Sequence, residues 1–464
     1  MQLRDQAWRH PKDQGPGNPM RDLITPANRP NLALVAWLAM FFSILIWTMP
    51  DATNQELGNS KNYYRMLLVV FAAAAAVWTL LRNGSRLQQA FPVPILMLMF
   101  YGAVATFSSV YIPEHAFYSM WKGLEVVVDV LCIAAILSYR EPQQNARVAY
   151  RMLPFLYGVL VIVYLVEAVV IPERALMPTR GYISIYLTGA LPIAPQNAVA
   201  FLSAVTVFAV FCRLHRPVSF LSRCAYLVML VLALATLIFA QSRTSVVALL
   251  VAVAVYFVFA RRYLSFAVMA GLGLMVAFYS QLSEVSMKYM LRGQDPELVS
   301  SLSGRTEGWE AAWDAFLESP IVGHGFAAFA RAHILGIHGL SSLHGAVFDV
   351  IVGTGLLGLI PWIGAMLWTL VVLLGLPMSG HPWFRTQVGR SMHAEMVGVV
   401  ALIAVRASTS SGLAMHEDNF MLLLSLIAYT FGIRHALRQK RVSPLEYPQV
   451  ATSAQRPRQV ANSA

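Results

Sequence analysis

An arginine in a very short turn is the first residue of this chain whose type and position predict chemistry. Arg243 lies in Gln-Ser-Arg-Thr-Ser at 241–245, between two long apolar runs with almost no loop. An arginine at the boundary of two packed membrane helices is costly unless it is paired or used. Thr244 or Ser245 can cap the following helix, and a helix N-terminus attracts anions. The pattern predicts an anion site, and a headgroup anchor explains it equally well.

A second arginine precedes a helical pattern. Arg305 lies in Ser-Gly-Arg-Thr-Glu-Gly-Trp at 303–309. Apolar residues then recur at helical spacing: Trp309, Trp313, Phe316 and Leu317. Pro320 ends the pattern, so an amphipathic helix with Arg305 at its N-terminus is predicted. A guanidinium beside a helix N-terminus makes an anion site; the alternative is an interfacial helix whose arginine reaches toward the headgroups.

A histidine opens the next long apolar run. His344 follows Ser-Ser-Leu and precedes Gly345. At the outer end of a membrane helix it can act as a general base near neutral pH, or it is an interfacial polar residue, and His333 and His338 compete with it for the first role. The chain has no H-E-x-x-H, C-x-x-C or P-loop pattern, so neither a metal nor a cofactor is expected.

Composition shows what must position these residues. Of 464 residues 57% are hydrophobic and 12% charged, and the mean hydropathy is +0.59, whereas soluble domains carry roughly 25% charged residues. Apolar runs near the ~20 residues that cross a bilayer are predicted at 31–49, 64–81, 91–110, 123–138, 152–171, 192–212, 224–241, 245–260, 264–282, 344–374, 393–407 and 419–433. The fold class is therefore an all-α polytopic membrane protein with about twelve transmembrane helices.

The charges predict the orientation of these helices. The formal net charge is +11, and the basic residues cluster at the ends of alternate apolar runs, where the positive-inside rule puts both termini in the cytoplasm. No basic soluble domain is present for nucleic acid. Residues 1–30 are predicted as a disordered cytoplasmic tail, 31–433 as the membrane domain and 434–464 as a basic cytoplasmic tail. The largest outward loop, 283–343, lies between the ninth and tenth helices.

Three stretches in this order resemble the O-antigen ligase and polymerase superfamily of the bacterial inner membrane. They are the turn at 241–245, the Gly-Arg, Trp and Ser-Pro-Ile-Val-Gly-His-Gly positions within 304–325, and the histidine with Gly-Leu-Leu-Gly within 344–358. Residues 190–200 are a weaker match to the family's junction between an outward loop and a helix. The chain departs from the family at Gly345, where asparagine is common.

The resemblance implies a GT-C-like fold and glycosyl transfer at the periplasmic face, from a glycan on undecaprenyl diphosphate, without a metal or a nucleotide sugar. Arg243 and Arg305 would bind the diphosphate and stabilise the leaving group, and His344 would position or deprotonate the acceptor hydroxyl. Additional substrate contacts are expected from other outward residues: Arg180, Asn197 and Arg406.

Two alternatives stay open beside the leading interpretation, which is a polymerase joining lipid-linked repeat units of exopolysaccharide or O-antigen. A ligase that moves the finished glycan to lipid A–core would use the same donor. A transporter of lipid-linked sugars is the alternative of another class, for which Glu125, Asp129 and Glu167 are candidate relay charges within the membrane. Expected partners are the lipid-linked oligosaccharide, membrane lipid and a chain-length regulator.

Overall fold

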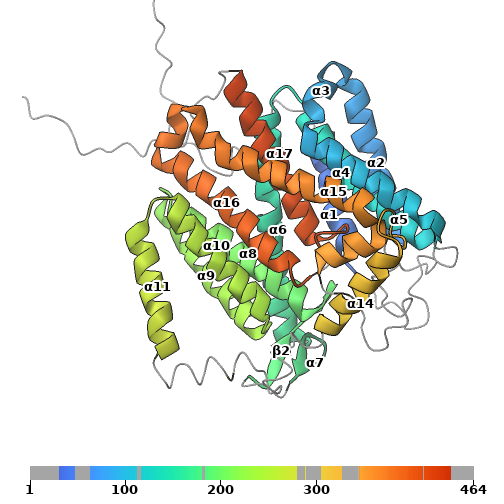
Figure 1. Ribbon diagram of the computed structural model, residues 1–464. Helices are drawn as coiled ribbons and strands as arrows, with labels where there is room; N and C mark the ends of the chain where they lie inside the picture. Colours follow the sequence, from blue (N-terminus) through green and yellow to red (C-terminus); the bar gives the residue numbers. More distant parts are fainter. Residues whose placement is uncertain are drawn as a thin grey trace, which may run out of the picture.

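The structure is a computed structural model, in which a bundle of long helices is joined by short connections (Figure 1). It describes residues 31–47, 63–111, 116–179, 183–278, 288, 305–326, 343, 345–410 and 412–439. The all-α polytopic architecture predicted from the sequence is confirmed. Within the described residues the only strands form two small hairpins.

Each predicted apolar run corresponds to one helix of the bundle. These helices are α1 (Leu32–Ile44), α2 (Tyr63–Arg82), α4 (Val93–Phe107), α5 (Ala116–Leu137), α6 (Pro142–Val170), α8 (Gln196–Leu214), α9 (Phe220–Phe239), α10 (Arg243–Phe259), α11 (Tyr263–Phe278), α15 (Ala346–Gly375), α16 (Gln387–Ala407) and α17 (Asp418–Arg438). Within the described chain eight are long and apolar enough to cross a membrane, whereas α1, α10 and α11 are apolar but shorter. Because α5 carries three charged residues, the number of crossings stays a prediction.

Short elements lie between these helices. They are η3 (Gly84–Arg86), α3 (Leu87–Ala90), η4 (Ser108–Tyr111), α7 (Pro172–Ala175), α14 (Arg305–Glu318), η7 (Leu376–Ser379) and η8 (Pro382–Arg385). The connection between α6 and α8, expected only as a loop, also forms two antiparallel hairpins: β1 (Leu176–Pro178) with β2 (Ile185–Leu187), and β3 (Gly189–Ala190) with β4 (Ile193–Ala194). We call the end of the bundle that carries α7, β2 and α14 the loop end (Figure 1).

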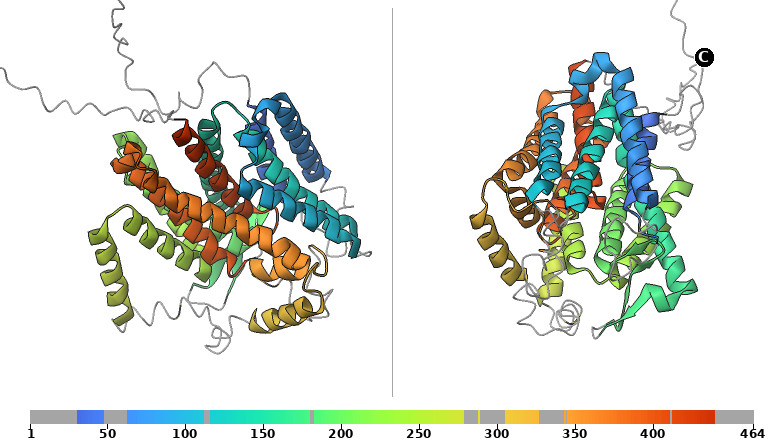
Figure 2. Two further views of the ribbon diagram at one scale, coloured as in Figure 1. Left: turned by 45° about the horizontal axis from the view of Figure 1, so that its top comes forward. Right: turned by 90° about the vertical axis from the view of Figure 1, so that its right-hand side faces the viewer.

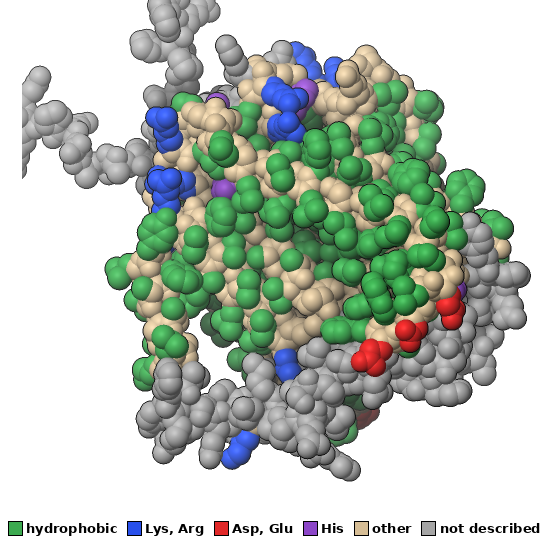
Figure 3. Space-filling model, viewed as in Figure 1, with side chains coloured by type: hydrophobic (Ala, Val, Ile, Leu, Met, Phe, Trp, Pro, Cys, Tyr) green, Lys and Arg blue, Asp and Glu red, His purple; other side chains and the backbone are tan. Residues whose placement is uncertain are grey.

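The surface between the two ends is apolar. Val231, Leu272 and Ile360, near the middles of α9, α11 and α15, are at least 59% exposed, which suits side chains that face lipid rather than water. In Figure 3 Lys and Arg gather toward the end opposite the loop end, and Asp and Glu lie along the loop end below a hydrophobic band. Helix α17 lies inside the bundle, and α11 stands at its edge (Figure 2).

Helix α15 is broken near its start, and the segment that follows α14 pairs with the break. Gly355 has φ 59° and ψ −160° inside the helix. Four backbone hydrogen bonds join the two segments: His324 N to Val352 O (2.8 Å), Gly325 N to Gly353 O (2.9 Å), Leu356 N to Pro320 O (2.9 Å) and Leu357 N to Ile321 O (3.0 Å). A helix broken at membrane depth must have its backbone groups satisfied within the protein, and the segment 320–325 supplies the partners.

Glycine is required on both sides of this pairing. A Cβ at Gly355 would collide with the backbone carbonyl of Ile321, and one at Gly323, whose φ is +70°, would stand 2.6 Å from Val352 O. Both positive φ values also disfavour any L side chain. The glycine-containing parts of the second and third motifs are therefore structural, because they fix each other.

Candidate functional site

The turn at 241–245 is tight, as predicted, and it is tied to the hairpins. Helix α9 ends at Phe239 and α10 begins at Arg243. The amide of Gln241 donates to the carbonyl oxygens of Ile183 (3.1 Å) and Ile185 (2.7 Å). This contact fixes the turn against β2 at the loop end.

The predicted caps of α10, Thr244 or Ser245, were wrong by two or three residues. Ser242, with extended backbone angles, is the N-cap, and its side chain makes no capping hydrogen bond. Thr244 and Ser245 already lie within the helix, and Ser245 Oγ donates to Ser242 Oγ (3.1 Å). The helix therefore starts earlier than expected, and the hydroxyl of Thr244 accepts a hydrogen bond from Arg406 of α16 instead of capping.

Arg406 brings the ends of three helices together. It lies in the last turn of α16 and is only 5% exposed. Its Nη1 donates to Thr244 Oγ1 (3.0 Å) at the start of α10, and its Nη2 donates to the backbone carbonyl of Asn197 (3.0 Å) at the start of α8. The structure thus brings together Arg406 and Asn197 from the predicted substrate contacts with the turn that carries Arg243. Asn197 takes part through its backbone oxygen rather than its amide.

Positive potential concentrates where these helix ends meet. Arg243 is the first residue of α10 and is half-buried. Arg406 donates a hydrogen bond to Thr244, the residue that follows Arg243 in the chain. The N-termini of α8 and α10 add two positive dipole ends, against one negative end from α16. Two guanidiniums beside two helix N-termini make a region that attracts an anion.

The segment around the predicted catalytic histidine reaches the same helix end. His344 itself lies outside the described residues, and its chain neighbours Leu343 and Gly345 are described. The indole N–H of Trp309 donates to Leu343 O (3.0 Å). A Cβ on Gly345 would lie 3.4 Å from Trp309 Nε1 and 3.8 Å from the carbonyl oxygen of Ser408, which follows α16. All three motif stretches therefore have residues around the end of α16.

Two further predicted residues cannot be placed by their side chains. Helix α14 begins at Arg305, as predicted, but the guanidinium of Arg305 is outside what the structure describes, and Arg180 lies outside the described residues altogether. Their roles, like that of His344, stay predictions.

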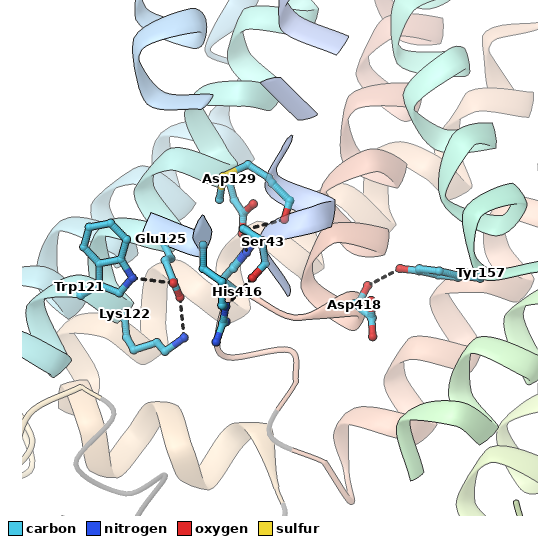
Figure 4. Close-up of polar contacts among 10 residues, drawn as sticks. Ser43, Trp121, Lys122, Glu125, Asp129, Tyr157, His416 and Asp418 are labelled. Atoms are coloured by element: carbon cyan, nitrogen blue, oxygen red, sulfur yellow. Dashed lines mark hydrogen bonds and ion pairs between the residues drawn. The ribbon is translucent and has the colours of Figure 1, made fainter. Parts of the chain in front are cut away.

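A buried polar network, which the sequence reasoning did not assemble, joins α1 and α5 to the segment before α17 (Figure 4). Nε2 of His416 lies 2.8 Å from Ser43 Oγ, and its Nδ1 lies 2.7 Å from Asp129 Oδ2. Arg65 Nε donates to Ser43 O (2.6 Å). The order Ser, His, Asp is that of a hydrolytic triad, but all three are at most 3% exposed, which leaves a substrate no access. The network holds the connection before α17 against α1 and α5.

The other charges considered for a membrane relay also have partners. Glu125 accepts hydrogen bonds from Trp121 Nε1 (2.7 Å) and Lys122 Nζ (2.7 Å) on its own helix (Figure 4). Glu167 accepts from the backbone N–H groups of Ala190 (2.8 Å) and Leu191 (2.9 Å), which fixes the hairpins on α6. These contacts favour a structural role for these carboxylates over ion relay.

Glu417 is a residue that the sequence reasoning missed. It directly follows His416 and precedes α17. Its side chain is exposed, and the positive charges of Lys122 and Arg406 are close enough to act on its carboxyl. An ionised carboxylate in the electrostatic reach of Arg406 can accept hydrogen bonds or a proton there. The polar run from His416 to Asn419 before the last apolar stretch was its only signal in the sequence.

The fold and these contacts define a polytopic helical membrane protein whose loop end holds a cationic site between helix termini. Residues 228–363 match the family model described as O-antigen ligase, and this range contains all three motif stretches. This match supports the resemblance to the O-antigen ligase superfamily that the motifs predicted, over residues 228–363 of the chain. Among curated proteins, no relative of the chain was found.

Proposed function

We propose that the chain transfers a glycan from undecaprenyl diphosphate to a sugar hydroxyl at the outer face of the bacterial inner membrane. The leading reaction is the joining of exopolysaccharide or O-antigen repeat units. The family match supports glycosyl transfer of the ligase or polymerase type. The donor, the membrane face and the choice of polymerase are our proposal.

The observation that carries the proposal is the anchoring of Arg406 on Thr244 and on the Asn197 carbonyl, beside Arg243 and two helix N-termini. In the reaction the bond between the donor sugar's anomeric carbon and the diphosphate oxygen breaks, and its electron pair leaves with the diphosphate. Positive groups fixed in advance around that charge stabilise the transition state.

The acceptor supplies the new bond. Its hydroxyl oxygen attacks the anomeric carbon, and its proton passes to a base as the bond forms. We assign this base to His344, as the family resemblance implies, with Glu417 as the carboxyl that the structure adds to the region. Arg305 is assigned to the diphosphate with Arg243.

The orientation follows from the charge distribution. Most of the basic side chains in view lie toward the end opposite the loop end (Figure 3), which the positive-inside rule assigns to the cytoplasm. The loop end, with the cationic site, then faces the periplasm, where lipid-linked glycans would be joined.

A ligase remains the second candidate, because the matching family model is itself described as O-antigen ligase. A deletion strain separates the two. Single repeat units still transferred to the acceptor, without polymer, show a polymerase; full-length polymer that stays on the lipid carrier shows a ligase. A transporter instead predicts that lipid-linked units accumulate on the cytoplasmic side.

Complementation of that strain tests the site. Arg243→Ala, Arg305→Ala and His344→Ala are each expected to abolish the glycan while the protein stays in the membrane. Arg223→Ala is the matched control, because Arg223 is exposed on α9 and belongs to the basic end. Normal glycan with all three site variants would refute the proposed mechanism.

A further inference from the structure

A shallow groove of about 400 Å³ lies where α14 meets the start of α15. Trp309, Glu310, Trp313, Asp314 and Phe348 line it. Of these residues, only Trp309 was described above among the contacts near the end of α16. The acidic side chains of α14 lie at the loop end beside a hydrophobic surface (Figure 3).

The floor of the groove is held rigidly. The ring of Trp309 stacks on Phe348, with centroids 5.3 Å apart and planes 15° from parallel, while its indole N–H is bonded to Leu343 O. The opposite face of α14 packs on α15 through a buried apolar cluster: Ala312, Ala315, Phe316, Leu343, Ile351 and Val352. The aromatic surface is therefore organised before any ligand arrives.

Two side-chain rows run along α14 next to each other. Trp309 and Trp313 are four residues apart, and so are Glu310 and Asp314, so each pair is separated by roughly 6 Å on the helix surface. Trp313 is 50% exposed, and both carboxylates are exposed. Aromatic faces offer apolar area with fixed geometry, and ionised carboxylates only accept hydrogen bonds.

We propose that this groove binds a pyranose unit of an uncharged glycan, as the acceptor subsite of the proposed glycosyl transfer. A pyranose has an apolar C–H face, which suits the indole rings, and a rim of hydroxyl donors, which suits Glu310 and Asp314. The inference rests on the proposed function for its place in the reaction. The groove adjoins Leu343 and Gly345, the residues that flank the assigned base.

Charge distinguishes this groove from the donor site. Phosphate or a uronate would be repelled by the two carboxylates, so the diphosphate is assigned outside the groove, to Arg243 and Arg305. Helices that anchor in a membrane surface carry Lys and Arg on their polar face. Helix α14 (Arg305–Glu318) carries four acidic residues, and its one basic residue, Arg305, stands at its N-terminus. This acidic balance favours a sugar over a lipid headgroup.

The test uses the full-length protein in phosphatidylcholine nanodiscs. The probe is the repeat-unit oligosaccharide released by mild acid from the lipid carrier of the deletion strain, with an oligogalacturonate as an anionic comparison. Saturation-transfer NMR and quenching of tryptophan fluorescence report binding. The wild type is expected to bind an uncharged repeat unit and to bind the oligogalacturonate at least ~10-fold more weakly.

Variants locate the binding. Trp313→Ala is expected to weaken affinity at least ~10-fold, and Trp313→Phe to retain part of it. The double variant Glu310→Gln with Asp314→Asn should bind the uncharged probe more weakly and should no longer discriminate against the oligogalacturonate. Trp78→Ala is the matched control, because Trp78 is 63% exposed on the distant helix α2, and it should bind normally. Unchanged binding by folded Trp313→Ala overturns the proposal. If that variant instead weakens the association of the protein with the bilayer, the groove is a lipid anchor, which also overturns the proposal.

The same measurements separate this inference from the proposed function. Arg243→Ala should lose polymer in cells and still bind the released oligosaccharide. If Arg243→Ala keeps normal polymer while Trp313→Ala loses binding, the groove stands and the proposed function fails. If Arg243→Ala loses polymer while the wild type does not bind the oligosaccharide, the function stands and the groove proposal fails.

Discussion

The contact of Arg406 with Thr244 allows a quantitative test of how the cationic site is held. Arg406 makes two hydrogen bonds of 3.0 Å, to Thr244 Oγ1 and to Asn197 O, and is 5% exposed. A hydrogen bond from a charged donor contributes about 1.5–3 kcal/mol to stability. Thr244→Val should therefore lower the free energy of unfolding by about 1.5 kcal/mol, and Arg406→Met, which loses both bonds, by about 3 kcal/mol.

The double variant separates this contact from unrelated damage. With Arg406 replaced, Thr244→Val no longer removes a bond to the guanidinium and loses only the long contact with Ser242 Oγ (3.4 Å). The pair of changes should therefore cost about 3 kcal/mol rather than about 4.5, a coupling of about 1.5 kcal/mol. The free energy of unfolding is measured by titrating SDS into mixed micelles of all four proteins. Thr244→Val should keep much of the glycan in cells, because it leaves both arginines in place.

Thr369→Val is the control for the loss of a buried hydroxyl. Thr369 is 1% exposed and donates only to Ala365 O on its own helix, at 2.7 Å. Such a bond to the preceding turn adds little to a helix, so the variant should stay within about 0.5 kcal/mol of the wild type. A coupling below about 0.5 kcal/mol between Arg406 and Thr244 would refute the contact on which the cationic site rests.

Three further predictions concern the frame of the site. Gly355→Ala should lower the free energy of unfolding by at least about 3 kcal/mol, because Gly355 has φ +59° and a Cβ there would collide with the backbone of Ile321. The control is Gly271→Ala on α11, where a Cβ meets open space, and it should leave the free energy of unfolding unchanged within error. Equal losses of stability in the two variants would contradict the pairing of the broken helix. His416→Leu should lower the free energy of unfolding by about 3–5 kcal/mol, because it leaves the buried Asp129 carboxyl without its partner. Adding Asp129→Leu should recover part of this loss in the same SDS titration. No recovery would contradict the interaction between His416 and Asp129. Burial holds the pKa of His215 below its ordinary value, so the folded protein takes up fewer protons than the unfolded chain. Stability should then be highest above pH ~6.5 and fall as the pH drops below it, and His215→Phe should flatten Tm measured from about pH 7 to 5; an identical pH profile would contradict this.

Local rules explain why so much of the frame could be predicted from the sequence alone. Lipid cannot hydrogen-bond to the backbone, so lipid-exposed segments must be helical. Each predicted apolar run corresponds to one helix, and α15 is broken only where residues 320–325 satisfy its backbone. The turn before Arg243 and the helix starting at Arg305 follow from residues adjacent in the chain. The motif order also predicted the family that the match at 228–363 supports.

Contacts between distant segments required the tertiary structure. His416 and Asp129 are 287 residues apart, and Arg406 and Thr244 are 162 apart, so no local period or spacing announces either pair. Thr244 could be read from the sequence as a cap, because a hydroxyl near a helix start is a good local partner. Only the packing of α16 on α10 decided that its hydroxyl would bind a guanidinium, since an interhelical hydrogen bond depends on which helix faces lie together and not on the chain between them.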